Sequence, residues 1–120
     1  MKLFSLALAA IASSSSGWVE HDVHYLNDVK YYTETDSIHR MDSTTVQVKV
    51  KQVYGSGNLY VGLYRFNCFL KEYQNGPGKL FDKDGKLISG GNYWSQWQSV
   101  YPSSAEDVLL TYVCAPKKPV

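Results

Sequence analysis

The sequence has few cysteines, no long run of like charge and no apolar run long enough to cross a membrane. Its formal net charge is +1, from 12 basic and 11 acidic residues in 120. Because a nucleic-acid binder gathers positive charge on one face, this balance argues against a nucleic-acid partner. The apolar segment from Leu3 to Ile11 has about half the length that spans a bilayer. A chain of this length is expected to form one domain.

The N-terminal apolar segment has the features of a secretory signal peptide. Lys2 provides a short positive region, and Ala10-Ile11-Ala12 fits the small-x-small pattern of leader peptidases. We predict a signal peptide over residues 1–12, cleaved near Ala12–Ser13, then a flexible serine-rich N-terminus over 13–17. A buried N-terminal helix is the alternative, which the serine run disfavours. The mature protein is expected in the periplasm, at the cell surface or secreted.

The expected state of the two cysteines, Cys68 and Cys114, depends on this predicted export. In an oxidising compartment two cysteines usually pair, whereas in the cytosol they would be ordinary buried thiols. A metal site would need more ligands than two thiolates. We therefore predict a Cys68–Cys114 disulfide.

Residues 18–120 are predicted to be one domain built mainly of strands. Val46, Val48 and Val50 alternate with polar residues over 44–53, which is the period of a strand with one buried face. The segment 59–73 is expected to be a long strand, or a strand with a bulge, whose apolar face carries Tyr60, Tyr64, Phe66, Cys68 and Leu70. Turns are expected around Asp36–Ser37 and over 74–78, a hairpin turn at Asp84–Gly85, and a loop or irregular strand over 90–97.

One C-terminal helix is predicted after Pro102. Ser103 and Glu106 have the spacing of a capping box. In a continuing helix residue 114 would point away from the apolar stripe, so we expect the helix to end just before Cys114. The predicted fold is α+β, a single antiparallel β-sheet with one C-terminal α-helix packed on it and tethered by the disulfide. The apolar stripe consists of Ala105, Val108, Leu109, Tyr112 and Val113.

The order of these motifs resembles the bacterial surface-adhesin protein E family, over nearly the whole mature chain. The resemblance implies an antiparallel sheet with a disulfide-held C-terminal helix, and adhesion to host extracellular-matrix proteins. Phe81 stands where the family usually has tyrosine, and the run SGGNYWSQW is particular to this chain. The matching positions are Asp36, Ser37, Ile38, Arg40, Cys68, Phe81, Asp82, Gly85, Trp97, Pro102, Ser104, Glu106 and Cys114.

No motif of catalysis or cofactor binding stands out. The sequence has no G-x-S-x-G nucleophile motif, and the acidic turn around Gly85 does not fit a calcium-binding EF-hand loop. His21 and His24 would lie on opposite faces of a strand, which disfavours a metal site. We therefore expect no enzyme activity, no cofactor and no metal.

Tyr93, Trp94 and Trp97 are the candidate partner-binding residues, because they lie among glycines and polar residues in a predicted loop. The alternative to partner binding is that these residues cover the open end of the core. This alternative is favoured for Trp97, whereas for Tyr93 and Trp94 neither interpretation is favoured. The expected function is an exported non-enzymatic protein that binds a protein partner. An envelope inhibitor or chaperone-like protein acting on a bacterial enzyme is the alternative, and an enzyme acting on polysaccharide is a third.

Overall fold

The computed structural model describes residues 17–23 and 28–116. The predicted signal peptide over 1–12 and residues 13–16 lie outside these ranges, as does His24 of the weighed metal pair. Within them, no helix combines the length and the apolar character needed to cross a membrane.

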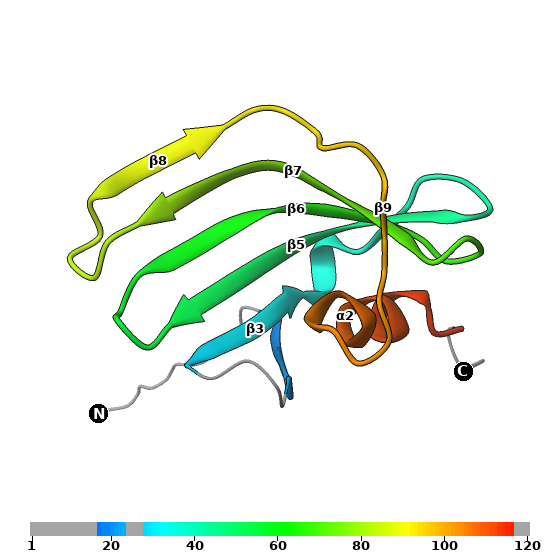
Figure 1. Ribbon diagram of the computed structural model, residues 1–120, viewed down its shortest axis with the longest axis horizontal. Coiled ribbons are helices and arrows are strands. Elements are labelled where there is room, and N and C mark those ends of the chain that lie inside the picture. The colour runs from blue at the N-terminus through cyan, green and yellow to red at the C-terminus, as the bar shows by residue number, and fades with distance from the viewer. Residues whose placement is uncertain (1–16, 24–27, 117–120) are drawn as a thin grey trace, which may run out of the picture.

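The described chain folds into one antiparallel sheet and one C-terminal α-helix, joined by a disulfide, so the predicted fold class is confirmed (Figure 1). A short 3-10 turn, η2 (Thr35–Ser37), stands where a turn was predicted, and the helix is α2 (Ala105–Cys114). The strands are β2 (Trp18–His21), β3 (Val29–Glu34), β4 (His39–Arg40), β5 (Thr45–Tyr54), β6 (Leu59–Asn67), β7 (Glu72–Phe81), β8 (Leu87–Gly91) and β9 (Gln98–Ser99).

The strand order is β2-β3-β5-β6-β7-β8, and the short strands β4 and β9 pair with β5 and β7. β5 and β6 form the centre of the sheet, because they pair along nearly their whole length. Figure 1 shows α2 beside β3 and β5, and β8 at the far edge of the sheet. The helix therefore covers only part of one face.

The alternation predicted in β5 is confirmed. Val46, Val48 and Val50 are at most 1% exposed, whereas Lys49 and Lys51 on the opposite face are partly exposed. Burying three β-branched side chains on one face of a central strand stabilises the sheet by about 1.5–3 kcal/mol for each residue. Besides these valines, the core contains Val23, Tyr31, Tyr64, Phe66, Ala105, Leu109, Leu110 and Val113.

The helix begins one residue later than the predicted capping box. Ser103 has a left-handed backbone with φ of 67°, so it belongs to the preceding turn. Ser104 is the N-cap, and its hydroxyl accepts a hydrogen bond from the Asp107 backbone N–H at 3.1 Å. The Asp107 carboxylate in turn accepts the Ser103 backbone N–H at 2.9 Å. The capping pair is therefore Ser104 and Asp107, not Ser103 and Glu106.

The helix also runs one residue further than expected, because α2 includes Cys114. The predicted stripe omitted Leu110, which is only 2% exposed, and included Tyr112, which is 39% exposed. Cys114 lies four residues after Leu110, so both side chains are on the same side of the helix. The buried face of α2 is therefore wider than the predicted apolar stripe. Cys114 lies on this wider face, so it reaches the sheet while the helix stays intact.

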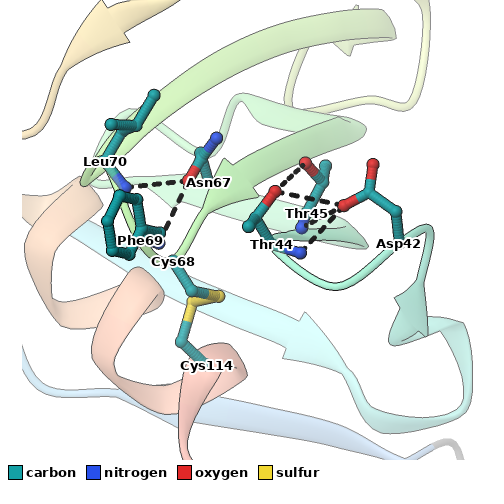
Figure 2. The surroundings of a disulfide bond; sticks show 8 residues. All are labelled: Asp42, Thr44, Thr45, Asn67, Cys68, Phe69, Leu70 and Cys114. Carbon is teal, nitrogen blue, oxygen red and sulfur yellow. Dashed lines mark hydrogen bonds between the residues drawn. A yellow bond between two sulfur atoms is a disulfide. The ribbon is translucent and has the colours of Figure 1, made fainter.

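The disulfide joins Cys114 to the turn after β6, as Figure 2 shows, and confirms the predicted pairing. β6 ends at Asn67 because its side-chain oxygen accepts the backbone N–H groups of Phe69 and Leu70, at 3.0 and 2.8 Å. Cys68 therefore lies in a turn, and Leu70 is 59% exposed rather than on the apolar face.

The prediction of a turn over 74–78 is wrong, because these residues lie inside β7. The register shifts there: Gly62 pairs with Gly78, whereas Tyr64 pairs with Asn75. Gly76 and Pro77 thus share one position of the ladder as a bulge, which accommodates a proline that has no N–H to donate. The hairpin turn predicted at Gly85, which has φ of 84°, is confirmed between β7 and β8.

Candidate functional site: the open face of the sheet

The sheet has two different faces. Val46, Val48 and Val50 point toward the core under α2, and the alternate residues of each strand point the other way. In the described ranges no helix covers this second face, which we name the open face. Following the strand registers, it carries Trp18, Glu20, Lys30, Tyr32, Glu34, Gln47, Lys49, Lys51, Val53, Val61, Leu63, Arg65, Glu72, Gln74 and Lys79.

The open face is positively charged although the chain is nearly neutral. Five basic and three acidic side chains lie on it, a net charge of +2. The other described residues carry four basic and eight acidic side chains, a net charge of −4. The nearly balanced composition does not reveal this separation of charges, because it arises from the arrangement of the strands. The five cations are Lys30, Lys49, Lys51, Arg65 and Lys79.

Lys51 is held between two aromatic rings. Its Nζ lies 4.5 Å from the centre of the Trp18 ring and 4.6 Å from that of Tyr32. On the same face the Lys49 Nζ lies 3.4 Å from a carboxylate oxygen of Glu34. Each cation–π contact contributes about 0.5–1 kcal/mol at an exposed site. The lysine side chain is therefore ordered before any partner arrives.

Arg65 forms a second cation–aromatic pair with Trp94. The guanidinium carbon lies 3.8 Å from the centre of the Trp94 ring, and Nε donates a hydrogen bond to the side-chain oxygen of Gln47 at 3.0 Å. The indole lies against Gly76, where an added Cβ would come within 2.5 Å of the ring. The glycine of the β7 bulge thus makes room for the tryptophan on the open face.

The three candidate aromatic residues do not form one cluster. Trp94 is half-buried against Arg65 on the open face, whereas Tyr93 is 87% exposed and lines a hollow on the opposite face. Trp97 is 40% exposed. Sequence reasoning missed Trp18, Tyr32 and Arg65. The alternation of β5 placed Lys49 and Lys51 on one polar face, but no signal in the sequence gives the strand register that brings the rings beside them.

Two hollows flank the β7–β8 end of the sheet, one on each face. The open-face hollow, of about 280 Å³, has Val61, Leu63 and Pro77 in its lining and is bordered by Lys49 and Lys79. The tyrosine hollow, of about 340 Å³, lies on the opposite face and is lined by Tyr54, Tyr60, Leu80, Ser89 and Tyr93 together with glycines.

Glycines shape the tyrosine hollow. Tyr60 lies across Gly62 and Gly78, and a Cβ at either position would meet its hydroxyl at 2.3 Å. Gly90 and Gly91 in β8 leave the adjoining edge without side chains. A third hollow, of about 590 Å³, lies at the β2 edge and is bordered by Glu20, Asp22, Asp28 and Lys30, among others.

The two cysteines and His21 have structural contacts. Both cysteines are in the disulfide. His21 is buried, its Nε2 lies 2.7 Å from the Thr33 hydroxyl, and its ring packs edge-on against Tyr112 at 4.5 Å. Burial lowers the pKa of His21, which favours the neutral imidazole. This arrangement offers ordered cations, aromatic rings and shallow apolar hollows, which are the elements of a binding surface.

Comparison with protein-family models, with curated proteins and with solved structures gives no match to this chain. The resemblance to surface-adhesin protein E therefore depends on the motif order alone.

Proposed function

We propose that this chain is an exported, non-enzymatic binding protein that holds a protein partner on its open face. The observation that carries the proposal is the pair of cations fixed on aromatic rings, Lys51 on Trp18 and Tyr32, and Arg65 on Trp94. Tryptophan, tyrosine and arginine are the residues that most often dominate the energy of protein interfaces. Cations already held by rings lose less side-chain entropy on binding than free ones.

Export is supported by the leader-like N-terminus and by the disulfide, because structural disulfides persist in oxidising compartments. The proposed location is the periplasm, the cell surface or the medium. The resemblance to surface-adhesin protein E supports a host extracellular-matrix protein as the partner. An enzyme of the bacterium's own envelope is the partner under the alternative of an inhibitor or chaperone-like protein.

The test is to immobilise the oxidised protein and to measure binding of a panel of host matrix proteins, alongside an extract of the producing cell's envelope. Two variants are compared, Lys79→Glu on the open face and Lys83→Glu in the β7–β8 turn. Both lysines are exposed, and both substitutions change the net charge by the same amount. We expect saturable binding that Lys79→Glu weakens by about tenfold or more.

Lys83→Glu is expected to leave that binding within about a factor of two, because rim charges away from the contact act mainly through long-range attraction. Equal losses in both variants would contradict the open face as the binding site. Binding confined to one envelope protein would select the inhibitor or chaperone-like alternative over adhesion.

A further inference from the structure

β8 ends the strand order of the described sheet and offers an unpaired edge. It pairs with β7 along one side only, and all five of its residues are exposed. Leu87 and Ile88 are 53% and 51% exposed. The strand has neither a charged residue nor a proline, the features by which natural edge strands avoid pairing with another chain. Figure 1 shows this edge on the side of the sheet away from α2.

The two hollows lie beside this edge on opposite faces of the sheet. Gly91 borders both, and Ser89 and Gly90 border the tyrosine hollow. An added Cβ at Gly91 would meet nothing within 4 Å, so the space at that position of the edge is open. An extended segment that pairs with a sheet edge points alternate side chains to opposite faces. In such a segment on β8, the side chains that point to one face would meet the open-face hollow, and those that point to the other face would meet the tyrosine hollow.

The hollows differ in chemistry. The open-face hollow has an apolar lining and is bordered by the exposed Lys79 on the strand next to β8, which suits the methylenes and carboxylate of a glutamate. The second lysine at its border, Lys49, is paired with Glu34. The tyrosine hollow is lined by Leu80 and by three tyrosine rings with no charged residue, which suits a large apolar side chain. The two faces therefore select two different kinds of residue in alternation.

We propose that β8 accepts an extended segment of the protein partner as an added strand, in which acidic residues alternate with large apolar ones. The acidic side chains contact Lys79 on the open face, and the apolar ones enter the tyrosine hollow. The inference rests on the proposed binding function and specifies the chemistry of the partner. A second copy of this chain fits less well, because its own β8 has no acidic residue to contact Lys79.

The probe is a synthetic peptide that alternates glutamate with phenylalanine, titrated into the oxidised protein by calorimetry. A peptide alternating lysine with phenylalanine, and a shuffled peptide of the same composition, are the controls. We expect the glutamate peptide to bind at least about tenfold more tightly than either control, because like charges at an interface exclude the wrong partner. Lys79→Glu is expected to reduce this preference, and Lys83→Glu is expected to preserve it.

Backbone pairing is tested with two N-methylated forms of the glutamate peptide. In an added strand alternate peptide N–H groups point toward β8, so N-methylation of one alternate set abolishes binding while the other set is tolerated. Amide hydrogen exchange of residues 87–91 should slow when the unmodified peptide binds.

Three results would overturn this inference. Equal tolerance of both N-methylated peptides would show side-chain docking without strand addition. Equal binding of the glutamate, lysine and shuffled peptides would contradict the proposed alternation of acidic and apolar residues in the partner. A dimer in sedimentation whose β8 amides are protected without peptide would make a second copy the occupant. None of these three results contradicts the proposal that the open face is the binding site. That proposal has its own test and is contradicted if Lys79→Glu and Lys83→Glu weaken the binding of panel proteins equally.

Discussion

At the scale of single residues, glycines shape the surface that the partner is proposed to use. Gly78→Ala would place a methyl group 2.3 Å from the Tyr60 hydroxyl, so the ring must move off the sheet. We expect the free energy of unfolding to fall by about 1–2 kcal/mol, near the lower end for an overpacked site because a ring can swing aside. Urea denaturation followed by tyrosine fluorescence measures the loss.

The matched control is Gly91→Ala, where a Cβ meets nothing within 4 Å and stability is expected to hold within about 0.5 kcal/mol. A second comparison places Gly78→Ala in a Tyr60→Ala background, where the cost should vanish. A cost that persists without the Tyr60 ring would show that the backbone, and not the ring, requires the glycine.

His21 predicts a pH dependence of stability. Burial lowers its pKa from the ordinary value of 6.5, so the unfolded chain takes up a proton at a higher pH than the folded chain. By linkage, the contribution of His21 is complete above about pH 6.5 and is lost as the pH falls from there toward the lowered pKa. We expect the free energy of unfolding to decrease between about pH 7 and pH 5.5, measured by urea denaturation.

His21→Gln should flatten that decrease, whereas His39→Gln, at an exposed position, should leave it unchanged. If the free energy of unfolding still decreases with falling pH in His21→Gln, the decrease is caused by other titratable groups.

The sequence alone predicted those residues whose environment follows from local alternation. Val46, Val48 and Val50 are the clear case. The pairs formed by Lys51 with Trp18 and by Arg65 with Trp94 join distant segments, so they depend on a strand register that local patterns do not encode. Trp94 was named as a candidate without the arginine that positions it.

At the scale of elements, the disulfide ties the last helix to the central strands. It links residues 46 apart in sequence, and closing such a loop in the unfolded chain is worth about 4 kcal/mol on the chain-entropy model. We expect reduction to lower the free energy of unfolding by about 2–4 kcal/mol, measured by urea denaturation with and without dithiothreitol. A Cys68→Ser/Cys114→Ser double variant should resemble the reduced protein and ignore the reductant. Two alkylated thiols in unreduced protein taken from the cell envelope would contradict the bond.

The N-terminus of α2 distinguishes two neighbouring serines. Ser104→Ala removes the hydroxyl that accepts the Asp107 N–H, and we expect it to cost about 1 kcal/mol in thermal or urea denaturation. Ser103→Ala should cost only a few tenths of a kcal/mol, because Ser103 contributes a backbone N–H to the cap and that group is retained. The reverse order of costs would restore Ser103 as the cap.

Secondary-structure elements were predicted correctly where local sequence determines them. The predictions failed where pairing with neighbouring strands overrides the local preference. The hairpin at Gly85 and the existence of the helix follow from turn chemistry and apolar spacing. Residues 74–78 have the glycines and proline of a turn, but they lie inside β7, which forms a bulge at Gly76 and Pro77 opposite β6. The helix extends through Cys114 because Leu110 widens its buried face.

At the scale of the whole molecule, the fold separates charges that the composition balances. The open face carries a net charge of +2 and the remainder of the described chain −4. An acidic partner is therefore oriented toward the open face as it approaches, and we expect its association rate to fall as ionic strength rises. This asymmetry arises from the strand order, which explains why counting charges along the chain could not predict it.

The most direct test of the central claim is a nuclear magnetic resonance footprint of the oxidised, ¹⁵N-labelled protein with the protein partner that the binding panel identifies. If the open face is the binding site, the indole N–H signals of Trp18 and Trp94 shift together, while the amides of α2 stay in place. Shifts confined to α2, or to the exposed turn at Phe69 and Leu70, would place the binding surface elsewhere and contradict the account.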